Sequence, residues 1–274
     1  MCKENPVLIA IAGATGRMGR ELIQAVAQSK RVILGAAITH DRSTLCGIDA
    51  GELVGINRLG VLISSELEAV KNNFDILIDF TCPNASMKYL AFCHQNNKSI
   101  VIGTTGFNQF QKNIIKACSK SIGIVFSANF SIGASLMLEL LKKAAKIVGE
   151  SCDIEIIEMH HRDKKDAPSA TAIAMGKNIA CAIGEKESNN YTLYDHKKYK
   201  NRYKMKKIGF SIIRAGDIIG EHTAIFAGIG ERLEITHKAL NRATFTKGVI
   251  RAVTWLADSK KKGFFNMQDL LNQK

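Results

Sequence analysis

The sequence lacks the long apolar runs that place a protein in a membrane. No such run approaches the roughly 18 residues that a helix needs to cross a bilayer, so we expect no transmembrane segment. The N-terminus, MCKENP, passes directly into an apolar run and leaves no room for a signal peptide. An internal repeat and a low-complexity linker are also missing. These absences predict a globular protein of the cytoplasm.

Paired cysteines are missing as well. The chain has seven cysteines, scattered singly and without a C-x-x-C pair. Such spacing is typical of a reducing compartment and argues against both disulfides and a zinc site. We therefore expect a cytoplasmic location and no bound metal.

The charge balance is strongly basic. Lys and Arg number 38 against 25 Asp and Glu, a formal net charge of +13. The densest basic segment, from His196 to Lys207, carries Tyr199 and Tyr203, and such interleaving can track phosphates and stack bases. Its position between an expected helix and an expected strand favours a surface loop. A basic protein also attracts small anions such as dinucleotides and di-acids, and these ligands are enough to account for the positive charge. We therefore expect no nucleic-acid partner, and we expect no membrane partner either.

The first residues have the pattern of a dinucleotide-binding turn. Val7–Ala12 is a short continuous apolar run, as in a parallel strand buried on both faces. The sequence GATGRMG follows, with glycines at 13, 16 and 19, and then a helical pattern. Gly13 permits the tight turn, Gly16 lets the backbone approach a pyrophosphate, and Gly19 lets the helix pack against the strand. Many strand–helix turns contain glycine only because the chain turns there. This motif directly follows the first strand of an alternating pattern, which favours a cofactor site.

The first half of the chain alternates expected strands and helices. Strands are predicted over residues 7–12, 32–38, 76–80, 99–103 and 123–127. Helices are predicted over residues 20–28, 65–72, 85–96 and 110–119. This alternation predicts an α/β fold of the Rossmann type, a doubly wound parallel sheet that binds ligands at the carboxyl ends of its strands.

After Phe130 the pattern changes. A long helix is predicted over Ile132–Val148 and a strand over Asp153–Glu158. Three β-rich runs follow at residues 208–214, 221–229 and 232–237, joined by glycine turns, which predicts a second, α+β domain with an antiparallel or mixed sheet. Final helices are predicted near 244–257 and 266–271. We expect a dinucleotide-binding domain over 1–130 plus 240–274, and a substrate-binding and oligomerisation domain over 131–239.

The segment Glu155–Ala172 concentrates chemically active side chains. Two histidines, two lysines and an arginine fall within six residues, before a helix that begins near Pro168. A helix N-terminus favours an anion. His160, His161 and Lys164 beside it are suited to holding a carboxylate-rich substrate and giving it a proton. The alternative is a solvated basic loop ahead of an ordinary capped helix.

Over essentially its whole length the chain resembles the 4-hydroxy-tetrahydrodipicolinate reductase (dihydrodipicolinate reductase) family of the diaminopimelate route to lysine. The shared motifs are AGATGRMG near Gly13, DFTCP at Asp79, IGTTGF at Ile102, SANFSIG at Ser127, EIIEMHHRDKKDAPSATA from Glu155, and IIRAGDIIGEHTAIFAGIGERLEITHKA from Ile212. The H-H-x-x-K-x-D-x-P-S-x-T-A pattern within them is the most specific.

The resemblance implies a reductase that uses NADPH or NADH to convert 4-hydroxy-tetrahydrodipicolinate to tetrahydrodipicolinate. It implies that His160 transfers a proton with Lys164 as its catalytic partner. The implied substrate-binding residues are His161, Ser169, Ala170 and Thr171. The implied cofactor-binding residues are Gly13, Ala14, Thr15, Gly16, Arg17, Met18, Gly103, Thr104, Thr105, Ser127, Ala128, Asn129 and Phe130, to which we add Thr39 and His40. A homotetramer assembled through the sheets of the second domain is also implied.

Two positions depart from the family pattern. Ala170 stands where the family usually has glycine, and we expect it to be helical and unstrained, with its N–H still able to bind a carboxylate. Thr39 stands where members commonly carry a glutamate that grips the adenine ribose. A neutral Thr39 beside His40 and Arg42 removes repulsion against a 2′-phosphate, although Asp41 opposes this. We therefore expect NADPH to be accepted at least as well as NADH.

Two other functions fit parts of the sequence. One is a different two-domain nicotinamide oxidoreductase, such as an amino-acid or imine reductase, that shares only the first domain. The other is an RNA-binding or cofactor-sensing protein that keeps the fold without catalysis. Neither explains the Glu155–Ala172 segment, and the intact His160, Lys164 and Thr171 set speaks against the second.

Overall fold

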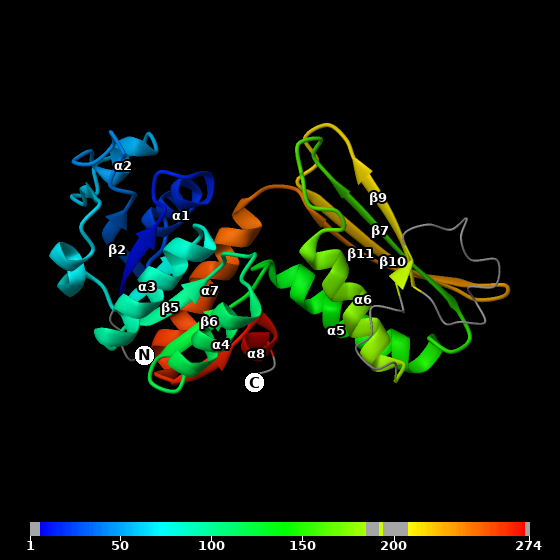
Figure 1. Cartoon of the computed structure of the whole chain (residues 1–274). Helices are drawn as coiled ribbons and strands as arrows, with labels where there is room; N and C mark the ends of the chain where they lie inside the picture. Colours follow the sequence, from blue (N-terminus) through cyan, green and yellow to red (C-terminus); the bar gives the residue numbers. More distant parts are fainter. Residues whose placement is uncertain (1–5, 185–191, 194–207, 272–274) are drawn as a thin grey trace. The chain divides into compact units, whose positions relative to one another are not determined.

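The computed structural model describes residues 6–184, 192–193 and 208–271 of the chain (Figure 1). The chain divides into two compact units, a first unit of Met1–Phe130 with Phe245–Lys274 and a second unit of Ser131–Thr244. The basic segment from His196 to Lys207, expected to be a surface loop, lies outside the described residues.

A parallel sheet of seven strands forms the centre of the first unit, in the order β12-β6-β5-β4-β1-β2-β3. The strands are β1 (Val7–Ala12), β2 (Val32–Ile38), β3 (Ile63–Ser64), β4 (Ile76–Asp79), β5 (Ser99–Ile102), β6 (Gly123–Phe126) and β12 (Gly263–Phe265). From β3 to β6 this is the strand order of dinucleotide-binding sheets, which reverses direction beside β1. The predicted Rossmann-type fold is confirmed, and the reversal places a ligand crevice at the carboxyl ends of β1 and β4.

Helices pack on this sheet through apolar side chains. They are α1 (Arg17–Ala27), α2 (Ala50–Leu53), the 3-10 helix η1 (Glu68–Asn73), α3 (Pro83–Gln95), α4 (Gln109–Cys118), α7 (Ala243–Ser259) and α8 (Met267–Leu271). One core cluster joins Ala10 of β1 and Ile100 of β5 to Leu90 of α3 and Ile115 of α4. Within the described part of the chain, no helix is long and apolar enough to cross a membrane.

The second unit is built on a mixed sheet of five strands, in the order β11-β10-β7-β9-β8. The strands are β7 (Asp153–His160), β8 (Thr192–Leu193), β9 (Ile208–Arg214), β10 (Gly220–Ala227) and β11 (Arg232–Ala239). Strand β7 pairs parallel with β9 and antiparallel with β10, which confirms the predicted mixed sheet. Helices α5 (Ile132–Val148) and α6 (Ala170–Ala182) lie together against one face of it (Figure 1).

Strand β7 is longer than the sequence predicted. The strand was expected to end at Glu158, before a charged turn that contains both histidines, but it continues to His160. Pairing with β9 extends as far as Arg214, and the Ala215 N–H donates to the His160 carbonyl at 2.9 Å. Because side chains alternate along a strand, Glu158 and His160 share the buried face. His160 is therefore part of the sheet and lies outside the solvated turn.

Candidate functional site

The glycine turn after β1 has the geometry of an anion cradle. Gly13 has a φ of +71°, and a Cβ added at Gly19 would lie 2.2 Å from the Gly13 carbonyl oxygen. Gly16 is the N-cap of α1, with no side chain capping the helix and no acidic residue in its first turn. The N–H groups of the first helical residues can therefore donate to a pyrophosphate, which the helix dipole also favours, whereas the Gly16 N–H already donates to the Gly13 carbonyl at 2.9 Å. Arg17 and Met18 begin the helix, and Arg17 is exposed.

Thr39 follows β2 and faces this turn. Its side chain is buried, and its Oγ1 lies 2.9 Å from Oγ1 of Thr15. His40, the next residue, is exposed, as are Asp41 and Arg42. The contact places the neutral residue that departs from the family pattern against the expected cofactor turn, with two basic side chains just beyond it.

Asp79 at the end of β4 holds the neighbouring loops in place. Its fully buried carboxylate accepts hydrogen bonds from the hydroxyls of Thr81 at 2.5 Å and of Ser86. The hydroxyl of Thr104, in the Gly-Thr-Thr loop after β5, donates to the same carboxylate at 3.3 Å. Burial raises the pKa of Asp79, although these donors oppose the rise. Sequence reasoning assigned no role to this residue, because the convergence of the Thr81, Ser86 and Thr104 hydroxyls on one carboxylate depends on the folded loops, and Thr104 lies 25 residues away.

The loop after β6 closes the same edge of the sheet. The Ser127 hydroxyl donates to the Asn129 carbonyl at 2.6 Å, and the Phe130 ring packs against Phe80 with centroids 5.5 Å apart. The structure thus gathers four expected cofactor-binding segments at neighbouring strand ends: Gly13–Met18, Thr39–His40, Gly103–Thr105 and Ser127–Phe130. This edge fits a dinucleotide.

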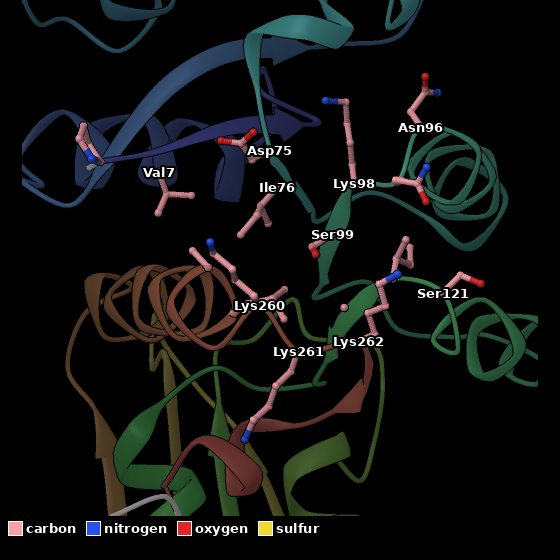
Figure 2. Close-up of a pocket in the computed structure, with 16 residues that line it drawn as sticks. Val7, Asp75, Ile76, Asn96, Lys98, Ser99, Ser121, Lys260, Lys261 and Lys262 are labelled. Carbon is pink, nitrogen blue, oxygen red and sulfur yellow. The ribbon is translucent and has the colours of Figure 1, made fainter. Parts of the chain in front are cut away.

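A cleft of about 510 Å³ lies at the opposite edge of the first sheet (Figure 2). It is lined by the first residues of β1, β4, β5 and β6 and by four lysines, among them Lys98 and Lys260. The Lys98 amine already donates to the Phe74 carbonyl at 2.6 Å and lies over the Phe74 ring. Because ligands of such sheets bind at the carboxyl ends of the strands, this cleft is a poor candidate for the cofactor site.

In the second unit, a buried carboxylate connects three elements. Glu158 is fully buried on β7, and its Oε1 accepts from Arg214 of β9 at 2.8 Å and from the Ser169 N–H before α6 at 3.1 Å. Its Oε2 lies 2.8 Å from Nδ1 of His160, without the alignment of a regular hydrogen bond. Burial raises the pKa of Glu158, but its contacts with His160, Arg214 and Ser169 outweigh burial and lower the pKa to about 2.

His222 of β10 completes this cluster. Its ring lies edge-on to that of His160, with centroids 5.1 Å apart, and its Nε2 is 3.0 Å from the Ser169 hydroxyl. Burial, and after it the neighbouring His160, lower the pKa of His222 to about 4. His222 is therefore neutral near pH 7.

Helix α6 begins where the sequence predicts, just after Pro168. Ser169 is the N-cap, and its hydroxyl accepts from the Ala172 N–H at 3.2 Å. Ala170 is the first helical residue and is absent from the residues with positive φ in the described part of the chain, which confirms an unstrained Ala170. Ala170 is exposed and Thr171 half-buried, so the helix start faces solvent and can receive an anion.

Lys164 and His161 lie on the loop between β7 and α6. The Lys164 amine contacts both carboxylate oxygens of Asp166, at 2.7 and 2.9 Å. Although burial acts in the other direction, Lys164 lowers the pKa of Asp166. His161 is half-buried at the end of the strand. All six residues expected to act on the substrate lie on the end of β7, on the loop that follows it or at the start of α6. Sequence reasoning missed Glu158, Arg214 and His222, of which Glu158 and His222 contact His160 and Ser169.

Comparison with known proteins agrees with both halves of this arrangement. Residues 7–130 match the family described as "Dihydrodipicolinate reductase, N-terminus", and residues 133–271 match "Dihydrodipicolinate reductase, C-terminus". Among solved structures, the chain is similar to a dipicolinate-bound dihydrodipicolinate reductase from Paenisporosarcina sp. TG-14. The two are 27% identical with a TM-score of 0.74, over 96% of this chain and 98% of that one.

More distant structures share the fold. GenD2 from gentamicin A biosynthesis, in complex with NAD, is 10% identical with a TM-score of 0.67, over 99% of this chain and 92% of that one. A probable dehydrogenase from Thermotoga maritima is 11% identical with a TM-score of 0.62, over 96% of this chain and 92% of that one. At these identities the likeness concerns the fold alone.

The Glu158 cluster leads to a prediction about stability. Glu158→Ala leaves the Arg214 charge partly buried without its partner, so we expect the free energy of unfolding to fall by about 3–5 kcal/mol. Glu234→Ala removes a carboxylate from an exposed pair with Arg232 and should cost no more than about 1 kcal/mol. Urea unfolding of both variants checks this. Equal losses would mean that the Glu158–Arg214 pair does not stabilise the unit.

Proposed function

The chain belongs to the dihydrodipicolinate reductase family, and from this premise we propose how its residues divide the work of the reaction. The protein is an oxidoreductase of the diaminopimelate route to lysine. The substrate 4-hydroxy-tetrahydrodipicolinate, a reduced nicotinamide cofactor and one proton give tetrahydrodipicolinate, the oxidised cofactor and water. The first unit serves as the dinucleotide-binding domain, and the second as the domain for substrate binding and oligomerisation. The observation that carries the proposal is the Glu158–His160 pair beside the start of α6.

We assign cofactor binding to the carboxyl edge of the first sheet. The backbone N–H groups of Arg17 and Met18 bind the pyrophosphate, which Gly16 lets approach because it has no side chain, and the loops Gly103–Thr105 and Ser127–Phe130 bind the nicotinamide half. The bound cofactor supplies the hydride. Thr39 contacts the turn without adding negative charge, while His40 and Arg42 are free to meet a 2′-phosphate. NADPH and NADH both serve, and NADPH binds at least as well.

We assign substrate binding to the start of α6. The N–H groups of Ala170 and Thr171 bind one carboxylate, as the helix dipole favours. His161 and Lys164 supply further cationic or hydrogen-bonding contacts. The Ser169 hydroxyl is already engaged by Ala172 and His222, so it acts mainly by fixing the helix start. The dipicolinate bound to the Paenisporosarcina relative supports a planar dicarboxylate ligand.

We assign proton transfer to His160. Hydride addition to the ring of the substrate places electron density there that a proton must meet, and an imidazole titrates in the required range. Lys164 stabilises the developing charge. Glu158 is a positioning residue, since it lies against Nδ1 of His160 while Arg214 and Ser169 fix its other oxygen. The fixed position of this carboxylate sets the orientation of the His160 ring.

We also propose a homotetramer that forms through the sheet face opposite α5 and α6. That face carries Ile157, Met159, Ile213 and Ile225, which are exposed or half-buried in the single chain. Partner subunits on this face would cover these apolar side chains, which single chains rarely leave together in water.

The first test concerns catalysis. His160→Gln and Lys164→Ala should each lower turnover by about a hundredfold or more, because such losses are usual when a proton-transfer group is removed. A synthase that makes the cyclic substrate can be coupled to the reductase, and loss of absorbance of the reduced cofactor then measures the rate. His94→Gln changes an exposed histidine of α3 and should keep the parent rate. Near-parent turnover in His160→Gln would remove that residue from the mechanism.

The second test concerns cofactor choice. Thr39→Glu places a carboxylate where it can bind the ribose hydroxyls and repel a 2′-phosphate. We expect kcat/KM to shift toward NADH by about tenfold or more, the scale of one charge-assisted hydrogen bond of roughly 1.5–3 kcal/mol. Thr39→Gln has the same shape without the charge and should leave the ratio nearly unchanged. If both variants change the ratio of kcat/KM for NADH and NADPH equally, the size of the side chain causes the change, and the proposed effect of charge at position 39 is wrong.

A further inference from the structure

Glu158, His160 and His222 form a cluster with the composition of a zinc ligand set. One donor atom from each residue lies within 4.8 Å of the other two, and all three residues are buried. Two imidazoles and one carboxylate, with a further position left for water, form a common ligand set of zinc. We propose that this cluster binds Zn²⁺, or a divalent ion of similar ligand preference, and that the bound ion inhibits the reductase reversibly.

Two atoms of the cluster support a ligand at this place. Oε2 of Glu158 and Nδ1 of His160 are buried and face each other at 2.8 Å, without a regular hydrogen bond to any described residue. Buried polar atoms are satisfied in the great majority of cases, so each such atom calls for an explanation. Zinc ligand atoms at bond lengths of about 2.0–2.2 Å lie closer together than 4.8 Å. The three donor atoms therefore already lie near the spacing that one ion requires.

Surrounding residues orient the proposed ligands. Arg214 and the Ser169 N–H hold Oε1 of Glu158, which turns Oε2 toward the two rings. The Ser169 hydroxyl holds the ring of His222 through Nε2. Partners of this kind fix the direction of metal ligands and contribute substantially to affinity in known sites. The sequence argument against a metal considered only the spacing of the cysteines. The proposed ligands are a glutamate and two histidines, and they come from β7 and β10, which are far apart in the sequence.

The charges nearby limit the affinity. Arg214 lies on the same carboxylate, and its positive charge opposes a divalent ion. Lys164 is a second cation of the site, partly offset by its pairing with Asp166. We therefore expect a reversible inhibitory ion that competes with the substrate for this part of the second unit, in contrast to a permanently bound structural zinc. The inhibition rests on the proposed proton-transfer role of His160, whereas the binding does not.

Binding is tested without substrate. Metal-free protein is titrated with Zn²⁺ by calorimetry and with Co²⁺ by visible absorption, since Co²⁺ on nitrogen and oxygen ligands lacks the near-ultraviolet band that thiolates give. Glu158→Gln and His222→Gln should each weaken the strongest site by more than about tenfold. His237→Gln should not, because that histidine is opposite His222 on β11 but bonds the Ser131 hydroxyl. Circular dichroism verifies that the variants remain folded.

A crystal of the intact protein soaked in Zn²⁺ gives a test that needs no variant. Anomalous scattering should place an ion among Glu158, His160 and His222, and an ion bound only at cysteines or elsewhere overturns the proposal. Turnover measured with added Zn²⁺ should fall as the site fills and recover with a chelator. If the ion occupies the cluster and turnover is unchanged, the inhibition and the role of His160 both fail. If no ion binds there but His160→Gln is inactive, only the metal site fails.

Discussion

The arrangement of the second unit depends on keeping the Glu158 carboxylate charged in a fully buried position. A buried charge is costly unless it is paired and hydrogen-bonded. Arg214 and the Ser169 N–H meet this requirement at 2.8 and 3.1 Å, and the pKa of Glu158 stays near 2 despite burial. Those contacts tie β7, β9 and the start of α6 together. The carboxylate that lies against His160 therefore also fixes the helix end proposed to bind the substrate.

A second buried carboxylate, Asp79, has a comparable place in the first unit but different partners. Its donors are hydroxyls, among them those of Thr81 and Thr104, and burial raises its pKa. Neutral donors fix the direction of the carboxylate without matching its charge. Glu158 differs from Asp79 because it is paired with Arg214. In the first unit the Asp79 carboxylate holds loops in position, whereas in the second unit the Glu158 carboxylate stays ionised next to an imidazole.

Local sequence signals were enough for parts of the structure that depend on neighbouring residues. The glycine turn at Gly13, the strand over Val7–Ala12 and the capped start of α6 all have local causes. The short elements β3 and β12 were missed, because two or three residues cannot show a periodic pattern. The predicted helix over 65–72 is instead the shorter 3-10 helix η1. The roles of Glu158, Arg214 and His222 also escaped prediction, since strand pairing across long sequence distances brings them together.

The central claim is that Glu158 acts on catalysis through His160, and a double-mutant cycle tests it most directly. Turnover is measured for Glu158→Gln, His160→Gln and the variant carrying both changes. If the carboxylate works only by orienting the imidazole, the double variant should be no slower than His160→Gln alone, because groups that act as one unit are strongly non-additive. If the two losses multiply instead, Glu158 contributes independently of His160, and the account of this site is contradicted.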